Sequence, residues 1–311
     1  MKNFTSIEDV PNPKGLIQDV INLIDQSNHS TIGKEKTLGM VFFNPSLRTR
    51  LSTQKAAQNL GMEVIVLNID KDAWNVEFED GTTMDGDSQE HIRDAVKVIS
   101  SYCDLLAVRT FASLTNRQQD YEERELQNFL KHSSVPVISM ESATLHPLQS
   151  LTDMATIVHT NIPKPKVVLS WAPHPKPLPQ AVANSFLEWV TELQAEVVVA
   201  HPKGYELSEK FAAGYKVTHN QQEAFKNADI IYAKNWSSYS DYGARPAVEE
   251  NWTITSELMQ KTNQAQFMHC LPIRRNVVAT DAVIDDSLVY QQAKNREYAA
   301  QAVIKNLLEV L

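Results

Sequence analysis

Residues 36–69 read KTLGMVFFNPSLRTRLSTQKAAQNLGMEVIVLNI, and their pattern is the clearest indication of the fold class. It begins and ends with short β-rich apolar runs, 36–43 and 62–69, which predict two strands. Between them, small and apolar residues recur at helical spacing, namely Thr53, Ala56, Ala57 and Leu60. Gly61 is placed to end this helix, because glycine readily adopts the left-handed conformation found there. The order strand, helix, strand predicts a βαβ unit with parallel strands.

The same rhythm continues along the chain. Further apolar runs lie at 104–109, 136–140, 166–172, 196–200, 229–234 and 266–271, so four runs precede residue 145 and four follow it. We therefore expect an α/β protein with two domains, each with a central parallel sheet flanked by helices. The boundary is expected near His146-Pro147. The spacing of Ala300, Val303, Ile304, Leu307 and Leu311 predicts a last helix that packs back onto one of the domains.

Composition limits the classes of function. The chain has 311 residues, and its 38 acidic against 29 basic side chains give a formal charge of −9, which opposes binding to nucleic acid or anionic membranes. The start, MKNFTSIEDV, lacks the apolar core of a signal peptide, and no run approaches the ~20 residues that span a bilayer. Cys103 and Cys270 are too few for a disulfide framework or a zinc motif. We expect a cytoplasmic protein with reduced thiols.

The first candidate site is Ser46-Leu47-Arg48-Thr49-Arg50, between the strand ending at Phe43 and the helix that follows. Ligands of α/β sheets bind at the carboxyl ends of strands. Backbone N–H groups at the helix start, two hydroxyls and a guanidinium would together hold an anion there. The structural alternative is a serine that caps the helix beside surface arginines. No Walker motif or G-x-G-x-x-G suggests a nucleotide.

A second candidate is His146-Pro147-Leu148-Gln149, preceded by Glu141 after the run 136–140. In this cluster His146 is suited to donate to a carbonyl oxygen and Gln149 to bind an amide. An ordinary loop histidine is the alternative. Arg109, at the end of the run 104–109, offers one more cation, or else an ordinary surface charge.

A third candidate is the segment 267–276, FMHCLPIRRN. Cys270 directly follows a predicted strand, and Arg274 and Arg275 come soon after it. Nearby cations lower the pKa of a thiol and make it reactive. A buried, inert cysteine is the alternative.

Together, FFNPSLRTR, HPLQ and HCLPIRR resemble, in this order, the motifs of the aspartate/ornithine transcarbamylase superfamily, and the resemblance covers essentially the whole chain. It implies a carbamoyl-phosphate-binding domain at 1–145, completed by a C-terminal helix at 290–311. It also implies a second domain at 146–289 for the amine substrate. The family further implies a homotrimer whose active sites are shared between subunits.

One segment departs from the pattern of ornithine enzymes. Where they carry an aspartate that pairs with the α-ammonium of ornithine, this chain has Lys234 in the stretch 233–238, AKNWSS. A desolvated lysine repels an ammonium, whereas it can donate to an amide carbonyl or pair with a carboxylate. We therefore expect an acylated α-amine. Two further segments, Asp72-Ala73-Trp74 with 84–87 and the stretch 171–179, resemble the N-acyl-ornithine branch of the family.

The acyl group is suggested by smaller features. Gln89 stands where the acetyl branch has glutamate and the succinyl branch has proline, so it decides nothing. Val278 stands where acetyl enzymes carry a lysine. With Lys176, Lys234 and Arg275 as possible partners for an extra carboxylate, the residues favour succinyl.

The resemblance implies roles for individual residues. Carbamoyl phosphate would be bound by Ser46, Leu47, Arg48, Thr49, Trp74, Arg109, His146, Pro147, Leu148, Gln149, Cys270, Leu271 and Arg296. N-acyl-ornithine would be bound by Gln89, Glu141, His146, His174, Lys176, Lys234, Leu271 and Arg274. The catalytic residues would be Arg48, His146, Cys270 and Arg274. No metal ion or organic cofactor is expected, because carbamoyl phosphate arrives activated.

The expected reaction transfers the carbamoyl group of carbamoyl phosphate to the δ-amine of N-succinyl-L-ornithine, giving N-succinyl-L-citrulline and phosphate in arginine biosynthesis. The proton of the amine would go to Cys270 or to the substrate phosphate. N-acetyl-L-ornithine is the alternative amine substrate. An ordinary ornithine or putrescine carbamoyltransferase and a noncatalytic paralogue are disfavoured. Putrescine has little use for Lys176 and Lys234, and the phosphate-binding motifs are intact.

Overall fold

The computed structural model describes residues 1–26, 29–69 and 74–310, and the chain divides into two compact units. Unit 1 comprises Met1–Ser113, Gln118–Leu148 and the chain from Arg296 onward. Unit 2 comprises Leu114–Arg117 and Gln149–Asn295. Among the described residues, no helix is both long and apolar enough to cross a membrane.

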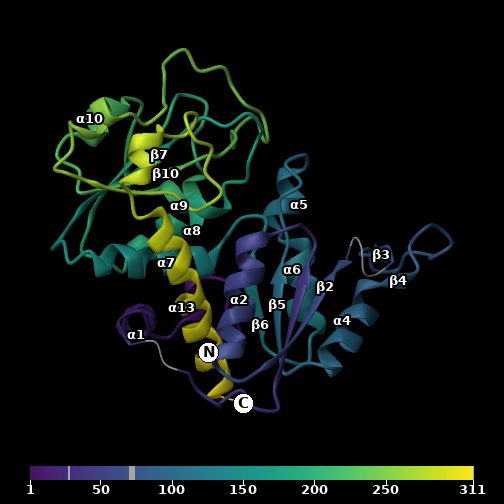
Figure 1. The fold of residues 1–311 in the computed structure, drawn as a ribbon. Helices are drawn as coiled ribbons and strands as arrows, with labels where there is room; N and C mark the ends of the chain where they lie inside the picture. Colours follow the sequence, from purple (N-terminus) through teal and green to yellow (C-terminus); the bar gives the residue numbers. More distant parts are fainter. Residues whose placement is uncertain (27–28, 70–73, 311) are drawn as a thin grey trace. The chain divides into compact units, whose positions relative to one another are not determined.

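Unit 1 is built on a four-stranded parallel sheet in the order β2-β1-β5-β6 (Figure 1). Its strands are β1 (Thr37–Phe42), β2 (Glu63–Asn68), β5 (Leu105–Arg109) and β6 (Val137–Glu141). The strand order reverses direction between β1 and β5, because β2 lies on one side of β1 and β5 on the other. The register pairs Phe42 with Arg109, and Arg109 with Glu141 across a local irregularity, so these carboxyl ends share one edge. Such a reversal point is where open α/β sheets bind ligands.

Helices cover both faces of this sheet, since right-handed crossovers that run in opposite directions place their helices on opposite faces. The helices are α1 (Pro13–Asp25), α2 (Leu47–Asn59), α4 (Ile92–Ser101), α5 (Arg117–Tyr121), α6 (Arg124–His132) and part of α13 (Val289–Leu308). A short 3₁₀ turn, Ile7–Asp9, precedes them, and β3 (Val76–Glu77) pairs in parallel with β4 (Glu90–His91). The helix expected before Gly61 is α2, and Gly61 has the left-handed φ of +82° that favours glycine.

One face of the sheet packs against α4 and α6 in a core of Val41, Ile92, Val96, Leu106, Val108, Leu126, Phe129 and Val137, all buried. On the other side, α2 lies beside α13 (Figure 1). The buried Asn59 of α2 donates from Nδ2 to Glu297 Oε1 at 2.9 Å and to Gln301 Oε1 at 3.1 Å. These contacts join segments that are more than two hundred residues apart in the chain. Leu311, which belongs to the apolar spacing of the last helix, lies outside the described residues.

Unit 2 has a five-stranded parallel sheet in the order β11-β10-β7-β8-β9. The strands are β7 (Lys166–Trp171), β8 (Glu196–Ala200), β9 (Lys216–Thr218), β10 (Ile230–Lys234) and β11 (Gln266–Met268). Its helices are α7 (Pro147–His159), α8 (Ala181–Val190), α9 (Glu209–Ala212), α10 (Gln221–Phe225), α11 (Ser256–Met259) and α12 (Asp281–Asp285). The first two residues of α7 belong to unit 1, and the helix belongs to unit 2 from Gln149 onward. The order reverses between β7 and β10, whose ends Trp171 and Lys234 are paired.

The fold class is therefore confirmed: each unit is a parallel sheet flanked by helices, and all eight apolar runs form strands. The sequence missed β3, β4 and β9. These strands have two or three residues, and none of their residues is buried, so they carry no apolar run to detect.

Asn59→Ala removes both hydrogen bonds from α2 to α13 and leaves buried acceptors without their donor. We expect the free energy of unfolding to fall by about 1–3 kcal/mol, measured by urea denaturation. Gln58→Ala, at the exposed neighbouring position, is the control and should change it by less than about 0.5 kcal/mol. Equal effects of the two substitutions would contradict a role for Asn59 in holding the last helix.

Candidate active site

Residues 46–50, which the sequence predicts to bind an anion and which are called the anion-binding segment for that reason, lie at the start of α2 beyond the carboxyl end of β1. Ser46 occupies the N-cap position with extended backbone, but its side chain makes no capping hydrogen bond within the described residues. Ser46 is therefore the N-cap residue by position, as in the structural alternative, but its side chain does not accept the capping hydrogen bond. Arg50 instead has a structural place, donating to Asn68 Oδ1 and lying over the ring of Phe42.

Thr49 and Arg296 meet in the interior of unit 1. Arg296 of α13 donates from Nη2 to Thr49 Oγ1 at 2.8 Å, and both residues are buried. A cation that the sequence places almost 250 residues away is thereby fixed beside the start of α2. Leu47, by contrast, is 66% exposed, so its side chain points away from this interior.

Arg109 is buried, so the alternative interpretation of Arg109 as an ordinary surface charge is wrong. Its Nη2 donates to Glu141 Oε2 at 2.6 Å, and Nη1 lies 3.3 Å from the carbonyl oxygens of Asn44 and Pro45. Those carbonyls belong to the segment that leads into Ser46. Arg109 thus holds the anion-binding segment against the end of β5, with Glu141 as its counter-charge.

His146 is also buried, and its Nε2 lies 3.7 Å from the same Glu141 oxygen. Glu141 therefore contacts two predicted ligands of carbamoyl phosphate. His146, Pro147 and Leu148 belong to unit 1, whereas Gln149 belongs to unit 2, so the division between the units falls inside the HPLQ motif.

In unit 2, Gln149 belongs to a buried polar network. Its Nε2 donates to Asp153 Oδ1 at 2.7 Å, and Gln292 Nε2 donates to the same oxygen at 2.7 Å. Gln292 Oε1 in turn accepts from the backbone N–H of His269 at 3.1 Å. This network links α7, α13 and the end of β11, immediately before Cys270.

Cys270 has a different setting from the one its neighbours in sequence suggest. Arg275 pairs with Asp281 Oδ1 at 2.8 Å and Asp285 Oδ1 at 2.6 Å. Arg275 already has two carboxylate partners from α12, so the structure gives no support to its role as a partner for a substrate carboxylate. Burial, together with the proximity of Asp153 and Cys270, raises the pKa of Tyr232 well above its usual value.

A cationic cluster surrounds His174 after the end of β7. Arg274 donates from Nε to His174 Nε2 at 3.0 Å, and His174 Nδ1 donates to the backbone carbonyl oxygen of Lys176 at 2.8 Å. Burial lowers the pKa of His174, and the cations Arg274, Lys234 and Arg245 lower it further. A neutral imidazole among several positive charges suits an anionic or carbonyl-bearing ligand.

The sequence missed Arg245 in this cluster. It lies in a loop and donates to the backbone carbonyl of Pro175. A lone arginine in a loop belongs to no recognisable pattern, so only the folded chain reveals its proximity to His174.

Next to this cluster, His269 is fully buried. Its burial, and next the positive charge of Lys234, lower its pKa to about 3. His269 is therefore neutral at physiological pH and serves as a fixed polar group rather than as a proton donor.

Trp74 and Gln89 form a separate locus in unit 1. They precede β3 and β4, whose pairing brings them together, and Gln89 N–H donates to the carbonyl of Asn75 at 3.0 Å. Trp74 is 52% exposed and donates from Nε1 to Glu90 at 2.9 Å. Asp72 and Ala73, which share the branch-like segment with Trp74, lie outside the described residues.

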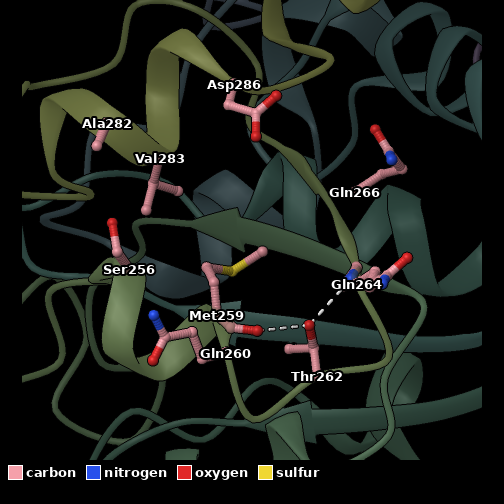
Figure 2. A pocket seen from close by; sticks show the side chains of 10 residues that line it. Ser256, Met259, Gln260, Thr262, Gln264, Gln266, Ala282, Val283 and Asp286 are labelled. Carbon is pink, nitrogen blue, oxygen red and sulfur yellow. Dashed lines mark hydrogen bonds between the residues drawn. The ribbon is translucent and has the colours of Figure 1, made fainter.

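A pocket elsewhere in unit 2 is unsuited to a phosphate group. Figure 2 shows it between α11, α12 and the start of β11, where Thr262 Oγ1 donates to the carbonyl of Met259 and accepts from the backbone of Ala265. Among the described residues, those that line it include no basic side chain, and Asp286 adds a negative charge. An anion has no partner there.

Comparisons with known proteins identify the family of this chain. Residues 2–159 match the family described as "Aspartate/ornithine carbamoyltransferase, carbamoyl-P binding domain", and residues 179–307 match its "Asp/Orn binding domain". The chain belongs to the aspartate/ornithine carbamoyltransferase family, and it is an enzyme of that class.

Several similar relatives are named for N-acylated ornithine, and ornithine carbamoyltransferases at 32% identity are also among the relatives found. N-succinylornithine carbamoyltransferase of Bacteroides fragilis (strain 638R) is 50% identical over 317 residues, covering 100% of both chains. N-acetylornithine carbamoyltransferase of Xanthomonas campestris pv. campestris is 38% identical and covers 88% of both chains. The solved structure of acetylornithine transcarbamylase complexed with acetylcitrulline has a TM-score of 0.91 at 34% identity, covering 99% of both chains. A mutant N-acetyl-L-ornithine transcarbamylase complexed with carbamyl phosphate and N-succinyl-L-norvaline has a TM-score of 0.90 at 35% identity, covering 99% of this chain and 100% of that one.

Glu141→Gln removes the carboxylate that neutralises the buried Arg109. Breaking a buried ion pair from one side leaves an uncompensated charge, so we expect a loss of about 3–5 kcal/mol in the free energy of unfolding, measured by urea denaturation. Glu63→Gln, at an exposed position at the start of β2, is the matched control and should be nearly neutral. A Glu141→Gln protein as stable as the wild type would show that Arg109 does not depend on this partner.

Proposed function

We propose that the protein transfers the carbamoyl group of carbamoyl phosphate to the δ-amine of N-succinyl-L-ornithine, giving N-succinyl-L-citrulline and phosphate in arginine biosynthesis. The single observation that carries the acyl part is Lys234, which ends β10 inside the cationic cluster around His174. The full-length similarity to relatives named N-succinylornithine carbamoyltransferase supports the same reading.

In this proposal, unit 1 binds carbamoyl phosphate. The start of α2 offers backbone N–H groups, and Ser46, Arg48 and Thr49 add hydroxyls and a guanidinium for the phosphate. Arg109 and Arg296 supply further positive charge, and His146 is assigned to the carbonyl oxygen. Pro147 and Leu148 shape the buried wall beside His146. Arg48 stabilises the negative charge that grows on the departing phosphate.

Unit 2 binds the acylated amine in this proposal. A free α-ammonium would lie beside Lys234, Arg274 and Arg245, which disfavours it, whereas an amide carbonyl accepts hydrogen bonds from such donors. The succinyl carboxylate gains charge-assisted bonds to the same cations, with His174, Lys176 and Leu271 completing the contacts. An acetyl group offers the carbonyl alone, and N-acetyl-L-ornithine is the second candidate substrate.

The amine must lose a proton as it attacks the carbonyl carbon, because its pKa in water is about 10.4. The substrate phosphate and Cys270 are the two candidate acceptors for this proton, and we assign Cys270 to contact with the carbamoyl group.

A homotrimer and a cytoplasmic location are also part of the proposal. Trp74 is a large aromatic side chain held in the open by Glu90, as expected for a residue that completes a neighbouring subunit's site. Cys103 and Cys270 are both free thiols, which fits a reducing compartment.

The substrate is tested by a ureido-product assay with carbamoyl phosphate and four amines: N-succinylornithine, N-acetylornithine, ornithine and putrescine. We expect kcat/KM to be highest for N-succinylornithine, lower for N-acetylornithine and lowest for the two unacylated amines. Charge-assisted bonds to the succinyl carboxylate should favour N-succinylornithine over N-acetylornithine by about 10- to 100-fold in kcat/KM. Lys234→Ala should remove most of this preference. It should leave the KM for carbamoyl phosphate nearly unchanged.

Lys226→Ala, at an exposed position of the same unit, is the matched control for the loss of a lysine and should keep the substrate ranking. A higher kcat/KM for N-acetylornithine would make this an acetyl enzyme. Efficient use of free ornithine would overturn the acylated substrate altogether.

Shared sites are tested by mixing two inactive variants. Arg48→Ala should lower kcat by about 10²–10³-fold, because it removes a donor to the leaving group, and Trp74→Ala should remove the contact that Trp74 makes with a substrate. Mixed assemblies contain some sites with neither lesion if Trp74 acts on a neighbouring subunit, so activity should return in part. Verified mixed trimers without recovered activity would contradict sharing through Trp74.

A further inference from the structure

Three potential metal ligands gather at the carboxyl ends of β8 and β9 in unit 2, apart from the residues assigned to the substrates. His201 directly follows β8, His219 directly follows β9, and Glu206 lies in the loop after β8. The parallel register pairs Ala200 with Thr218, and this pairing sets the two histidines side by side. One ligand atom from each of the three residues lies within 4.8 Å of the others.

The backbone fixes which ring nitrogen carries the hydrogen in the neutral form of both imidazoles. His201 Nδ1 lies 2.9 Å from the carbonyl oxygen of Pro202, and His219 Nδ1 lies 2.9 Å from the carbonyl oxygen of His201. Because a carbonyl only accepts, each Nδ1 carries the hydrogen, which leaves the lone pair of the neutral ring on Nε2. Metal-binding histidines are oriented in this way by a second hydrogen bond.

The third ligand is oriented as well. Glu206 Oε1 accepts from the backbone N–H of Gly204 at 3.1 Å. His201 is only 2% exposed, whereas Glu206 and His219 are exposed, so an ion can approach from solvent and reach a ligand that the fold holds rigidly. The two imidazole rings are 5.1 Å apart at an angle of 72°.

We propose that His201, Glu206 and His219 bind one divalent transition-metal ion of the zinc class, with water in the remaining position. Two imidazoles and a carboxylate suit Zn²⁺ and its neighbours in the first transition series, whereas Mg²⁺ and Ca²⁺ prefer oxygen ligands. Ion binding here is independent of the proposed reaction, since none of the three residues is assigned to a substrate.

The ion would stabilise a loop on which other parts of unit 2 rest. Tyr205, next to Glu206, packs on Trp171 with ring centroids 4.5 Å apart, and its carbonyl accepts from Trp236 Nε1 at 2.7 Å. Trp171 ends β7, and Trp236 lies two residues beyond Lys234. A metal that joins the loop to β9 therefore opposes local unfolding of this packing. An ion that binds only the folded chain raises the temperature of unfolding.

The test uses full-length protein freed of metal with a chelator. We expect Zn²⁺ to bind in calorimetric titration and to raise the midpoint of thermal unfolding, and Mg²⁺ to do neither. Co²⁺ should give the visible absorption of a nitrogen- and oxygen-ligated site. His219→Ala and Glu206→Gln alter exposed side chains, so the folded protein is expected to persist. Each should weaken Zn²⁺ binding by about 10-fold or more and remove the thermal shift.

His29→Ala and Glu209→Gln, at exposed positions outside the cluster, are the matched controls and should bind Zn²⁺ as the wild type does. Far-UV circular dichroism checks that every variant is folded. Unchanged Zn²⁺ affinity in His219→Ala and Glu206→Gln, or no Zn²⁺ binding by the wild type, would overturn the site. Neither result bears on the carbamoyl transfer assay, so failure of this proposal and failure of the proposed function remain distinguishable.

Discussion

Parallel strand pairing is the constraint on which every candidate site in this protein depends. Neighbouring parallel strands end at the same edge of a sheet, so residues far apart in the chain meet there. In unit 1 this constraint brings Arg109 to the segment before Ser46, and in unit 2 it pairs the end of β10 at Lys234 with the end of β7. The cluster of His201 and His219 results from the same rule applied to β8 and β9.

Placing positive charge inside an acidic protein requires local compensation. Arg109 is buried with Glu141, which meets the cost of desolvating a guanidinium without removing its remaining N–H groups from the anion-binding segment. Arg275 shows the opposite outcome, because two aspartates of α12 neutralise it fully at the surface. Among the residues that the structure describes, no carboxylate is paired with the cations around His174. A carboxylate of a ligand could therefore pair with them.

The helix α13 explains why the last residues of the chain belong with the first. Its Arg296 is held by Thr49, and its Glu297 and Gln301 accept from Asn59, so α2 is fixed along its length. The position of the anion-binding segment at the start of α2 therefore depends on residues from the C-terminal end of the chain. Buried side-chain contacts of this kind couple binding geometry to stability.

The sequence by itself determined the fold class, the eight principal strands and the three motifs, because apolar periodicity and short motifs are local properties of a chain. It did not determine which charges are neutralised. Arg274 and Arg275 are neighbours in sequence, yet the fold turns one toward His174 and the other toward α12. It also gave no sign of Arg245 or of the three metal ligands, whose proximity arises from loops and strand register. Only the tertiary structure decides such contacts, because they depend on distances between residues that no local pattern encodes.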